Sequence, residues 1–525
     1  MKTSADIVVL GGGLGGCMAA LAAAKSGLHV ILTEETDWLG GQLTSQAVPP
    51  DEHRWIESFG CTRTYREFRE RVRRYYKDNY PLKEEPSLNE RLNPGNGWVS
   101  RLCHEPKVSL RVIEDMLAPY TSNGRILLYL GFRPVKADAN GDFVNSVTVF
   151  NESTGSRVTL TAASFLDATE CGDLLPLAGI EYVTGAEARS ETGEPHAPDI
   201  ADPLDIQSIT HVFALDYAEG EDHTIGKPEQ YDFWRTFVPG FSRHPLLSWV
   251  IPDVSATDEM REIVFMPDGI EPMPLWTYRR IIDASLYEAA FYESDITLVN
   301  WSQNDYFLGP VYEVSEEERL VNLLGARQLS LSLVYWLQTE APRPDGGKGY
   351  PGIRLRKDVL GTEDGLAKYP YIRESRRIKA VQTVTENDVS REVRGDRGIR
   401  RYEDSVGVGS YHLDLHPTTR TNRMCYIPSY PYEIPLGALL PIRVKNVLPA
   451  CKNIGTTQIA NGCYRLHPTE WNIGESAGYL AAYAIKNGIT PHEVRADSDH
   501  LSSFLELLDR EGIQTHWPDE VAKQE

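Results

Sequence analysis

The first 35 residues limit the fold more strongly than any other stretch of this chain. "ADIVVLGGGLGGCMAALAAAKSGLHVILTEE" predicts a short strand at 6–10, an Ala-rich helix at 14–26 and a second strand at 28–33. Two apolar strands, a glycine turn before the helix and Gly27 after it follow the order of a βαβ unit. The sequence therefore predicts an α/β fold built on a Rossmann-like parallel sheet.

Three glycines and one acid predict what this unit binds. Gly11, Gly13 and Gly16 form G-x-G-x-x-G, and Glu34 follows the last of them by 18 residues. The first glycine permits a tight turn, the second lets a pyrophosphate approach the backbone, and the third lets the helix pack on the strand. Glu34 is placed to accept hydrogen bonds from a ribose hydroxyl. A single dinucleotide site of this kind holds either NAD or FAD.

The chain has 525 residues, which is more than one hydrophobic core organises, so several units are expected. Alternating apolar residues, with turns at Asn140-Gly141 and Thr154-Gly155, predict a β-meander that ends in a buried strand. The predicted units are a cofactor-binding domain at 1–185 with a helical insertion at about 50–105, an inserted mixed α+β substrate domain at 186–400, the rest of the cofactor-binding domain at 401–490, and a C-terminal helical tail at 491–525.

Charge and cysteine content narrow the partners. The formal net charge of −22 disfavours binding to nucleic acid or to anionic membranes. Seven cysteines without a C-x-x-C pair disfavour a disulfide framework, and we predict no metal site. The apolar run at 7–24 contains five glycines and leads into a strand, so it is not read as a membrane span or signal segment. We expect a cytoplasmic protein, and the sequence leaves a homo-oligomer open.

Four further blocks carry a family resemblance. They are "LGGQLTSQ" shortly after Glu34, "FLDATECGDLLPLAG", "YIRESRRI" and the closing "NIGTTQIANGCYRLHPTEWNIGESAG". With them the chain resembles the FAD-dependent oxidoreductases of the glutathione-reductase-like superfamily (flavoproteins of the two-dinucleotide-binding type), and most closely a largely uncharacterised subgroup. The blocks are spread over essentially the whole chain. The resemblance implies FAD as the cofactor and an oxidoreductase as the activity.

The resemblance also implies which residues contact FAD. It assigns Gly11, Gly13 and Gly16 to the pyrophosphate and Glu34 to the adenosine ribose. The chain departs from the pattern at Glu170, where glycine is common, and at Asn453, where the superfamily usually carries the aspartate of Gly-Asp. Asn453 is therefore only a candidate for the ribityl chain. The other implied contacts, along the ribityl–flavin path, at the adenine edge and at a strand end, are Gly40, Gly41, Thr44, Val135, Asp167, Ala168 and Thr169.

"RLHPTEWNIGESAG" predicts the polar start of an Ala-rich helix near the C-terminus. A helix N-terminus carries unpaired N–H groups and a partial positive charge. We expect the amides around Asn472, Ile473 and Gly474 to face the flavin edge at which negative charge develops on reduction. Gly474 is also expected to let the cofactor and the sheet approach closely. The alternative is a core helix with packing glycines.

Histidines and an arginine provide acid–base candidates. His412 and His416 flank Asp414 in "YHLDLHPTTR", and residues spaced by two share one face of a strand. Such a trio suits a metal site, a His–Asp base or an ordinary hydrogen-bonded cluster. Arg465 and His467 immediately precede the predicted flavin-facing helix. Each histidine suits a base that removes a proton during hydride transfer to flavin, and equally a structural role.

Candidate substrate residues lie in the inserted domain. "LVNWSQNDYFLG" concentrates Trp301, Asn304 and Tyr306, which suits a polar, sugar-like or amine-containing substrate and suits a well-satisfied loop equally. Arg376 in "YIRESRRI" is a candidate for an anion or substrate contact, with a salt-bridged strand as the alternative.

These features predict an FAD-dependent oxidoreductase that oxidises a small polar metabolite at a CH–OH or CH–NH group. Hydride would pass to flavin N5, and oxygen or an external acceptor would reoxidise the flavin. One alternative is a C=C reductase of the fumarate-reductase-like type, and another is a non-catalytic FAD-binding electron carrier. Modification of tRNA is disfavoured by the acidic charge.

Overall fold

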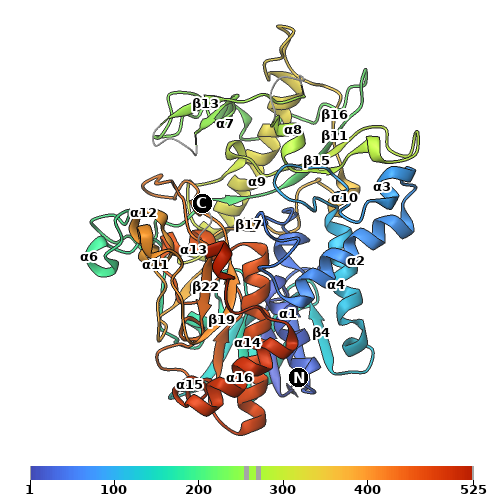
Figure 1. Ribbon diagram of the computed structural model, residues 1–525. Coiled ribbons are helices and arrows are strands. Elements are labelled where there is room, and N and C mark those ends of the chain that lie inside the picture. Colours follow the sequence, from blue (N-terminus) through green and yellow to red (C-terminus); the bar gives the residue numbers. More distant parts are fainter. Residues whose placement is uncertain (1, 254–258, 268–272, 523–525) are drawn as a thin grey trace.

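The computed structural model describes residues 2–253, 259–267 and 273–522 (Figure 1). Its centre is a five-stranded parallel sheet in the order β23-β8-β2-β3-β4. The central strand β2 is entirely buried, as expected for a strand covered on both faces. The predicted α/β fold with a Rossmann-like parallel sheet is confirmed. The strands are β2 (Ile7–Leu10), β3 (Val30–Glu34), β4 (Ile126–Leu130), β8 (Ser164–Asp167) and β23 (Val447–Pro449), and helix α1 (Leu14–Lys25) joins β2 to β3.

The β-meander forms a second sheet in the order β1-β7-β6-β5. Its hairpins turn at Gly141 and Gly155, whose positive φ angles of 59° and 68° suit glycine. An N-terminal strand that the sequence pattern did not predict, β1, pairs in parallel with β7 and makes this sheet mixed. The strands are β1 (Lys2–Ser4), β5 (Phe132–Asn140), β6 (Phe143–Asn151) and β7 (Ser156–Thr161).

Helix α14 (His467–Asn487) packs along α1, although their sequences are far apart (Figure 1). A Cβ atom on Gly474 would lie 2.0 Å from the carbonyl oxygen of Gly15, and one on Gly478 would lie 2.4 Å from that of Ala19. The glycines therefore allow two helices to touch, backbone against backbone. Gly474 was expected to let the cofactor and the sheet approach closely, but its close neighbour is the backbone of α1.

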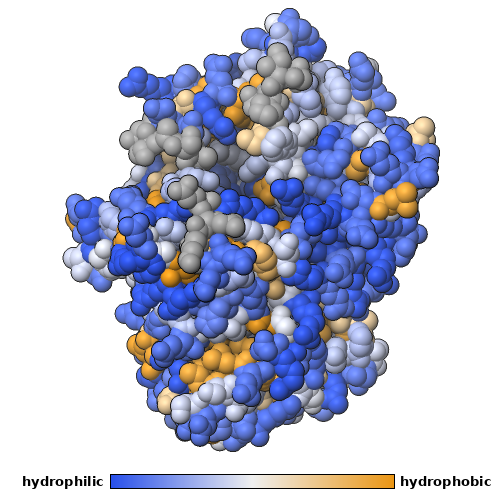
Figure 2. Space-filling view, viewed as in Figure 1, coloured by the Kyte–Doolittle hydropathy of each residue, from blue (hydrophilic) through white to orange (hydrophobic). Residues whose placement is uncertain are grey.

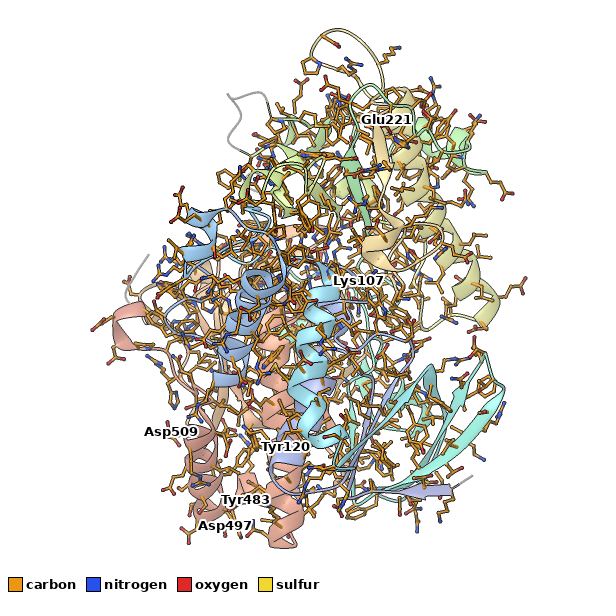
Figure 3. All side chains as sticks on the ribbon, turned by 90° about the vertical axis from the view of Figure 1, so that its right-hand side faces the viewer. Lys107, Tyr120, Glu221, Tyr483, Asp497 and Asp509 are labelled. Atoms are coloured by element: carbon orange, nitrogen blue, oxygen red, sulfur yellow. The ribbon has the colours of Figure 1, made fainter. Side chains whose placement is uncertain are left out.

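The inserted region has its own antiparallel sheet, in the order β14-β15-β11-β16, and its own hydrophobic core. The long helix α9 (Glu316–Thr339) contributes to that core with one buried face. Figure 1 places this region at the top of the molecule, above the parallel sheet, and Glu221 marks it in Figure 3. We call it the cap. Its strands are β11 (Phe213–Tyr217), β14 (Arg280–Ile282), β15 (Ile296–Val299) and β16 (Ile353–Leu355).

The remaining elements surround these sheets. In Figure 3, Lys107 and Tyr120 mark the two ends of α4, which runs from the cap side down beside the parallel sheet. The other helices are α2 (Arg63–Asn79), α3 (Glu84–Leu88), α4 (Pro106–Thr121), α5 (Leu174–Leu177), α6 (Arg189–Thr192), α7 (Tyr231–Thr236), α8 (Leu275–Tyr278), α10 (Lys357–Leu360), α11 (Glu386–Val389), α12 (Arg391–Arg394), α13 (Gln458–Tyr464), α15 (Pro491–Ala496), α16 (Ser498–Glu511) and α17 (Asp519–Ala522). The other strands are β9 (Tyr182–Val183), β10 (Ile209–Thr210), β12 (Val250–Pro252), β13 (Met260–Glu262), β17 (Tyr371–Ile372), β18 (Arg377–Ile378), β19 (Ser405–Gly409), β20 (Leu413–Leu415), β21 (Cys425–Ile427) and β22 (Tyr432–Pro435).

The face drawn in Figure 2 is mostly hydrophilic, and its apolar residues form separate patches. Across the described part of the chain, every helix is too short or too polar to span a bilayer.

Candidate functional site

The glycines of the fingerprint bring the start of α1 against the ends of two strands. Gly11 has a φ of 93°, and a Cβ atom there would lie 2.3 Å from the carbonyl oxygen of Ala168. A Cβ atom on Gly16 would lie 1.9 Å from the carbonyl oxygen of Gly11. Only glycine fits at either position. The unpaired amides at the start of α1 are thereby held at the carboxyl edge of the sheet, where an anion binds well.

Glu34 ends β3 beside this turn. Its Oε2 accepts a hydrogen bond from the amide of Gly12 at 2.8 Å, and its Oε1 accepts one from the amide of Thr36 at 2.8 Å. Burial raises the pKa of Glu34 to about 7. The carboxylate is thus fixed at the place where the sequence predicted a ribose contact.

A cavity of about 410 Å³ runs along this edge. The backbone register between β5 and β6 skips Val135, so a bulge lies beside the cavity wall formed by Phe132 and Pro134. Of the predicted contacts, Gly11, Glu34, Gly41, Ala168 and Thr169 line this cavity.

Four predicted contacts instead make hydrogen bonds within the protein. Thr44 donates its hydroxyl to the carbonyl oxygen of Leu39 at 2.6 Å. Asp167 accepts from the hydroxyl of Thr169 at 2.7 Å, and Asn453 donates to the carbonyl oxygen of Asp167 at 3.0 Å. Asp167 and Asn453 thus join the ends of β8 and β23. Gly40 donates its amide to the carbonyl oxygen of Gly12 at 2.8 Å and fastens the loop to the turn.

A buried charge cluster that sequence reasoning missed lies over the start of α1. Oε1 of Glu170 is 2.8 Å from the Cβ position of Gly13 and from that of Gly41. Lys452 is fully buried, contacts Glu170 and lies 3.6 Å from Oε2 of Glu470. The spacing of these residues in the sequence gave no sign that they meet.

The start of α14 differs from the prediction. The helix begins at His467, so Asn472, Ile473 and Gly474 lie beyond its first turn, and the unpaired amides at this start are those of His467 and Thr469, because Pro468 has no N–H. The side chain of Asn472 accepts from the amide of Val408 at 3.1 Å and so fastens α14 to β19. The predicted presentation of amides by residues 472–474 is therefore corrected to the turn that His467 begins.

His467 is fully buried at that turn. Its Nδ1 accepts a hydrogen bond from the amide of Asp51 at 3.0 Å, which places the ring proton on Nε2. Nε2 has no hydrogen-bond partner among the described residues. Burial, with the nearby charge of Arg279, lowers the pKa of His467 to about 3. His467 is thus a neutral hydrogen-bond donor and is not suited to act as the predicted base.

His416 lies between two carboxylates. Its Nδ1 is 2.6 Å from Oδ2 of Asp305, and its Nε2 is 3.3 Å from Oδ2 of Asp414. The same Asp414 oxygen is 3.2 Å from Nη2 of Arg465, and Asp305 accepts from Arg373 at 2.8 Å. Two of the predicted catalytic residues, His416 and Arg465, are therefore joined through one carboxylate.

The charged groups of this network shift one another's pKa values. Burial alone would raise the pKa of Asp305, but Arg373 and His416 lower it to about 2. Burial and Arg373 lower the pKa of His416, whereas Asp305 and Asp414 raise it, and the net result lies above the ordinary histidine value. Asp305 is therefore ionised at neutral pH and able to orient and charge the imidazole.

Among the described residues, His412 makes no hydrogen bond or ion pair with this network, although Asp414 and Arg465 lie near enough to shift its pKa. Its ring is stacked between the rings of Tyr411 and Tyr426, with both centroid distances at 3.9 Å, and burial lowers its pKa to about 4. Of the predicted trio, His416 and Asp414 are in contact, whereas His412 acts on Asp414 only as a nearby charged group.

A second cavity of about 1800 Å³ opens between the cap and the C-terminal part of the chain. His416, Asp414 and Asp305 lie in its wall, together with Tyr426 and Gln303. In the described part of the chain, we find no group of three or more His, Cys, Asp or Glu residues arranged to hold a metal ion.

The predicted substrate residues do not line this cavity. Asn304 is fully buried and donates to the carbonyl oxygen of His211, and Tyr306 donates its hydroxyl to Asn322 at 3.0 Å. Trp301 packs in the cap core. Arg376 is held by Glu313 at 2.6 Å and by Asp173 at 3.0 Å. The structure therefore places these four away from this cavity, and the residues of the segment at 298–309 that line it are Ser302, Gln303 and Asp305.

A family model described as FAD dependent oxidoreductase matches residues 6–505. No curated protein matches the chain. Among solved structures, the chain is similar to a geranylgeranyl bacteriochlorophyll reductase-like protein from Thermoplasma acidophilum, with 11% identity, a TM-score of 0.29, and coverage of 100% of this chain and 89% of that one.

Two other solved structures match over shorter spans. The glycerol-3-phosphate dehydrogenase from Bacillus halodurans complexed with FAD is 12% identical, with a TM-score of 0.23 and coverage of 41% of this chain and 40% of that one. The L-proline dehydrogenase from P. horikoshii is 17% identical, with a TM-score of 0.18 and coverage of 35% of this chain and 24% of that one. The chain thus spans less than half of either dehydrogenase.

Proposed function

The chain belongs to the FAD dependent oxidoreductase family, and on this premise we propose that it oxidises a small polar metabolite at a CH–OH or CH–NH group. The position of His416 is the main support for this proposal. His416 is hydrogen-bonded to Asp305 in the wall of the large cavity, and Asp414 joins it to Arg465 beside α14. This arrangement provides a base, a group that orients the base, and a cavity for the substrate. We further propose that oxygen or an external acceptor takes the electrons, and that the protein works in the cytoplasm.

FAD is the cofactor of the family, and the residues present fit it. The turn at Gly11 and Gly13 with the start of α1 would hold the pyrophosphate, and Glu34 would hold the ribose. Three buried polar atoms near the start of α14 have no hydrogen-bond partner among the described residues: Oε1 of Gln42, Nε2 of Gln46 and Nε2 of His467. Such a mixture of donors and acceptors suits the polar edge of a flavin ring.

Bound FAD supplies a two-electron acceptor for this chemistry. The protein's own part is to hold and move the proton. Nδ1 of His416 donates to Asp305, which leaves Nε2 as the basic nitrogen on the side of Asp414. His416 then takes the proton from the substrate's O–H or N–H group as its C–H bond is broken. The ionised Asp305 stabilises the imidazolium that results.

The proposal is tested by mixing the purified holoenzyme, without oxygen, with a panel of alcohols, polyols, hydroxy acids, amines and amino acids. Bleaching of the oxidised flavin absorbance by one of these classes is the expected result. The photoreduced enzyme is then mixed with a matching panel of enoates. Reoxidation by enoates alone would replace the proposal with C=C reduction, and a flavin that responds to neither panel would favour an electron carrier.

The affinity for FAD should depend on the cluster over α1. Glu170→Gln removes a carboxylate from the space at Gly13 and leaves Lys452 without its main partner, so the Kd for FAD should fall about 3- to 10-fold. Lys452→Met should raise it about 10- to 100-fold, because a buried positive charge near the phosphates is lost. Titration of apoprotein followed by flavin fluorescence measures both.

The exposed Glu85→Gln on α3 serves as the control and should leave the affinity unchanged. An unchanged Kd in Glu170→Gln would show that this carboxylate does not oppose the pyrophosphate.

A further inference from the structure

A second arginine approaches the site from the cap. Arg279 follows α8, and its side chain is 9% exposed. Its Nε and Nη1 atoms have no hydrogen-bond partner among the described residues. The nearest recorded charge is Asp51, whose Oδ1 lies 3.8 Å from Nη1, beyond hydrogen-bond distance. A buried guanidinium with two unused N–H groups requires an acceptor that the described side chains do not provide.

Arg465 lies between α13 and α14. Its Nη1 donates to the hydroxyl of Tyr371 at 2.7 Å, and its Nη2 contacts Asp414. Its Nε is buried and has no hydrogen-bond partner among the described residues. Asp51 connects the two arginines in space. Its Oδ1 is 3.8 Å from Nη1 of Arg279, and its amide donates to Nδ1 of His467, two residues after Arg465. The charges of Arg279 and Arg465 are also the leading effects that oppose the rise that burial gives to the pKa of Asp51. Both guanidinium groups therefore lie near Asp51.

Unused hydrogen-bond donors mark this volume. The guanidinium groups of Arg279, Arg373 and Arg465 face the carboxylates of Asp51, Asp305 and Asp414, so these charges balance when His416 is in its basic form. Nε and Nη1 of Arg279 and Nε of Arg465 are buried and have no acceptor among the described residues. A buried donor without an acceptor is costly, so an acceptor group such as a carboxylate would complete the site.

We propose that the substrate carries a carboxylate, held between Arg279 and Arg465 beside the carbon that His416 serves. This inference rests on the proposed oxidation and narrows its substrate to 2-hydroxy or 2-amino acids. The distance between the base and the arginine follows from Asp414. His416 and Arg465 contact the same oxygen of that residue, so they lie within two hydrogen-bond lengths of each other. The guanidinium fork pairs bidentately with carboxylates and phosphates, and a 2-hydroxy or 2-amino acid carries its carboxylate next to the carbon that is oxidised.

The test measures binding to the holoenzyme by isothermal titration calorimetry, so that no turnover is needed. Benzoate is the probe, its neutral isostere benzamide is the matched ligand, and inorganic phosphate is the alternative anion. Benzoate should bind at least about ten-fold more tightly than either. Arg279→Met should weaken benzoate binding about ten-fold or more. Arg279→Lys keeps the charge but loses the planar guanidinium, so its benzoate affinity should lie between those of the wild type and Arg279→Met.

Arg376→Met is the matched control, because Arg376 is equally buried but is fully engaged by Glu313 and Asp173. It should leave benzoate affinity unchanged. Equal affinity for benzoate and benzamide, tighter binding of phosphate, or wild-type affinity in both Arg279 variants would overturn the carboxylate site. If neutral alcohols bleached the flavin and benzoate did not bind, the carboxylate site would be wrong while the proposed oxidation would stand. Benzoate binding without any bleaching substrate would instead remove the proposed oxidation.

Discussion

His416→Gln is expected to lower kcat/KM by about 10²- to 10⁴-fold, which is the usual contribution of a positioned general base. The glutamine can still donate a hydrogen bond to Asp305, but it cannot accept a proton. FAD content and the thermal midpoint should remain close to wild type, because His416 lies in the cavity wall and contacts none of the residues proposed to hold the cofactor. Steady-state kinetics with a substrate identified by flavin bleaching provides the measurement.

The pH profile separates a base from a merely structural histidine. A base acts in its unprotonated form, so kcat/KM should rise as the pH passes the pKa of His416, which lies above the ordinary histidine value. The charge of Asp305 raises that pKa, so Asp305→Asn should move the inflection to lower pH while also lowering the maximum rate.

His412→Gln is the matched control from the same segment. Its ring packs between two tyrosines and makes no hydrogen bond to Asp305 or Asp414, so the variant should keep kcat/KM within a few-fold of wild type. Comparable losses in the two histidine variants, or an inflection that Asp305→Asn does not move, would contradict the assignment of His416.

The features that the sequence predicted best are those formed by residues adjacent in the chain. The βαβ unit was predictable because its strand, turn and helix are adjacent in the chain and each glycine has a local steric reason. The pairing of His416 with Asp305 was not, because the two residues are 111 positions apart and meet only through the packing of the cap. Residue identity told which groups could act, whereas tertiary packing decided which of them meet.

Two predicted site positions differ from the structure by one or a few residues, each for a local structural reason. In the segment at 298–309 the composition indicated a polar site, but the short 3-10 helix at 302–304 turns Asn304 into the core and leaves Asp305 facing the cavity. At the start of α14, Pro468 suits the first turn of a helix, so the helix begins before the small-residue pattern that marked it in the sequence.

Gly474→Ala is expected to destabilise the fold by about 1–3 kcal/mol, because the added Cβ atom would lie 2.0 Å from the carbonyl oxygen of Gly15. The obstacle is backbone rather than a mobile side chain, so α1 and α14 must move apart. The start of α1 holds the proposed pyrophosphate site, and the start of α14 holds His467. We therefore expect a lower thermal midpoint and weaker retention of FAD in the same variant.

Gly226→Ala is the control for the glycine effect, since a Cβ atom there would meet no atom within 4 Å. It should leave both readouts unchanged. If Gly474→Ala lost stability but retained FAD at wild-type affinity, the helix contact would support the fold without setting the cofactor site. If it lost both, a contact between residues more than 450 positions apart would be what brings the two halves of the FAD site together. The second outcome follows from the geometry, because Gly15 lies within the first turn of the helix that begins after Gly13.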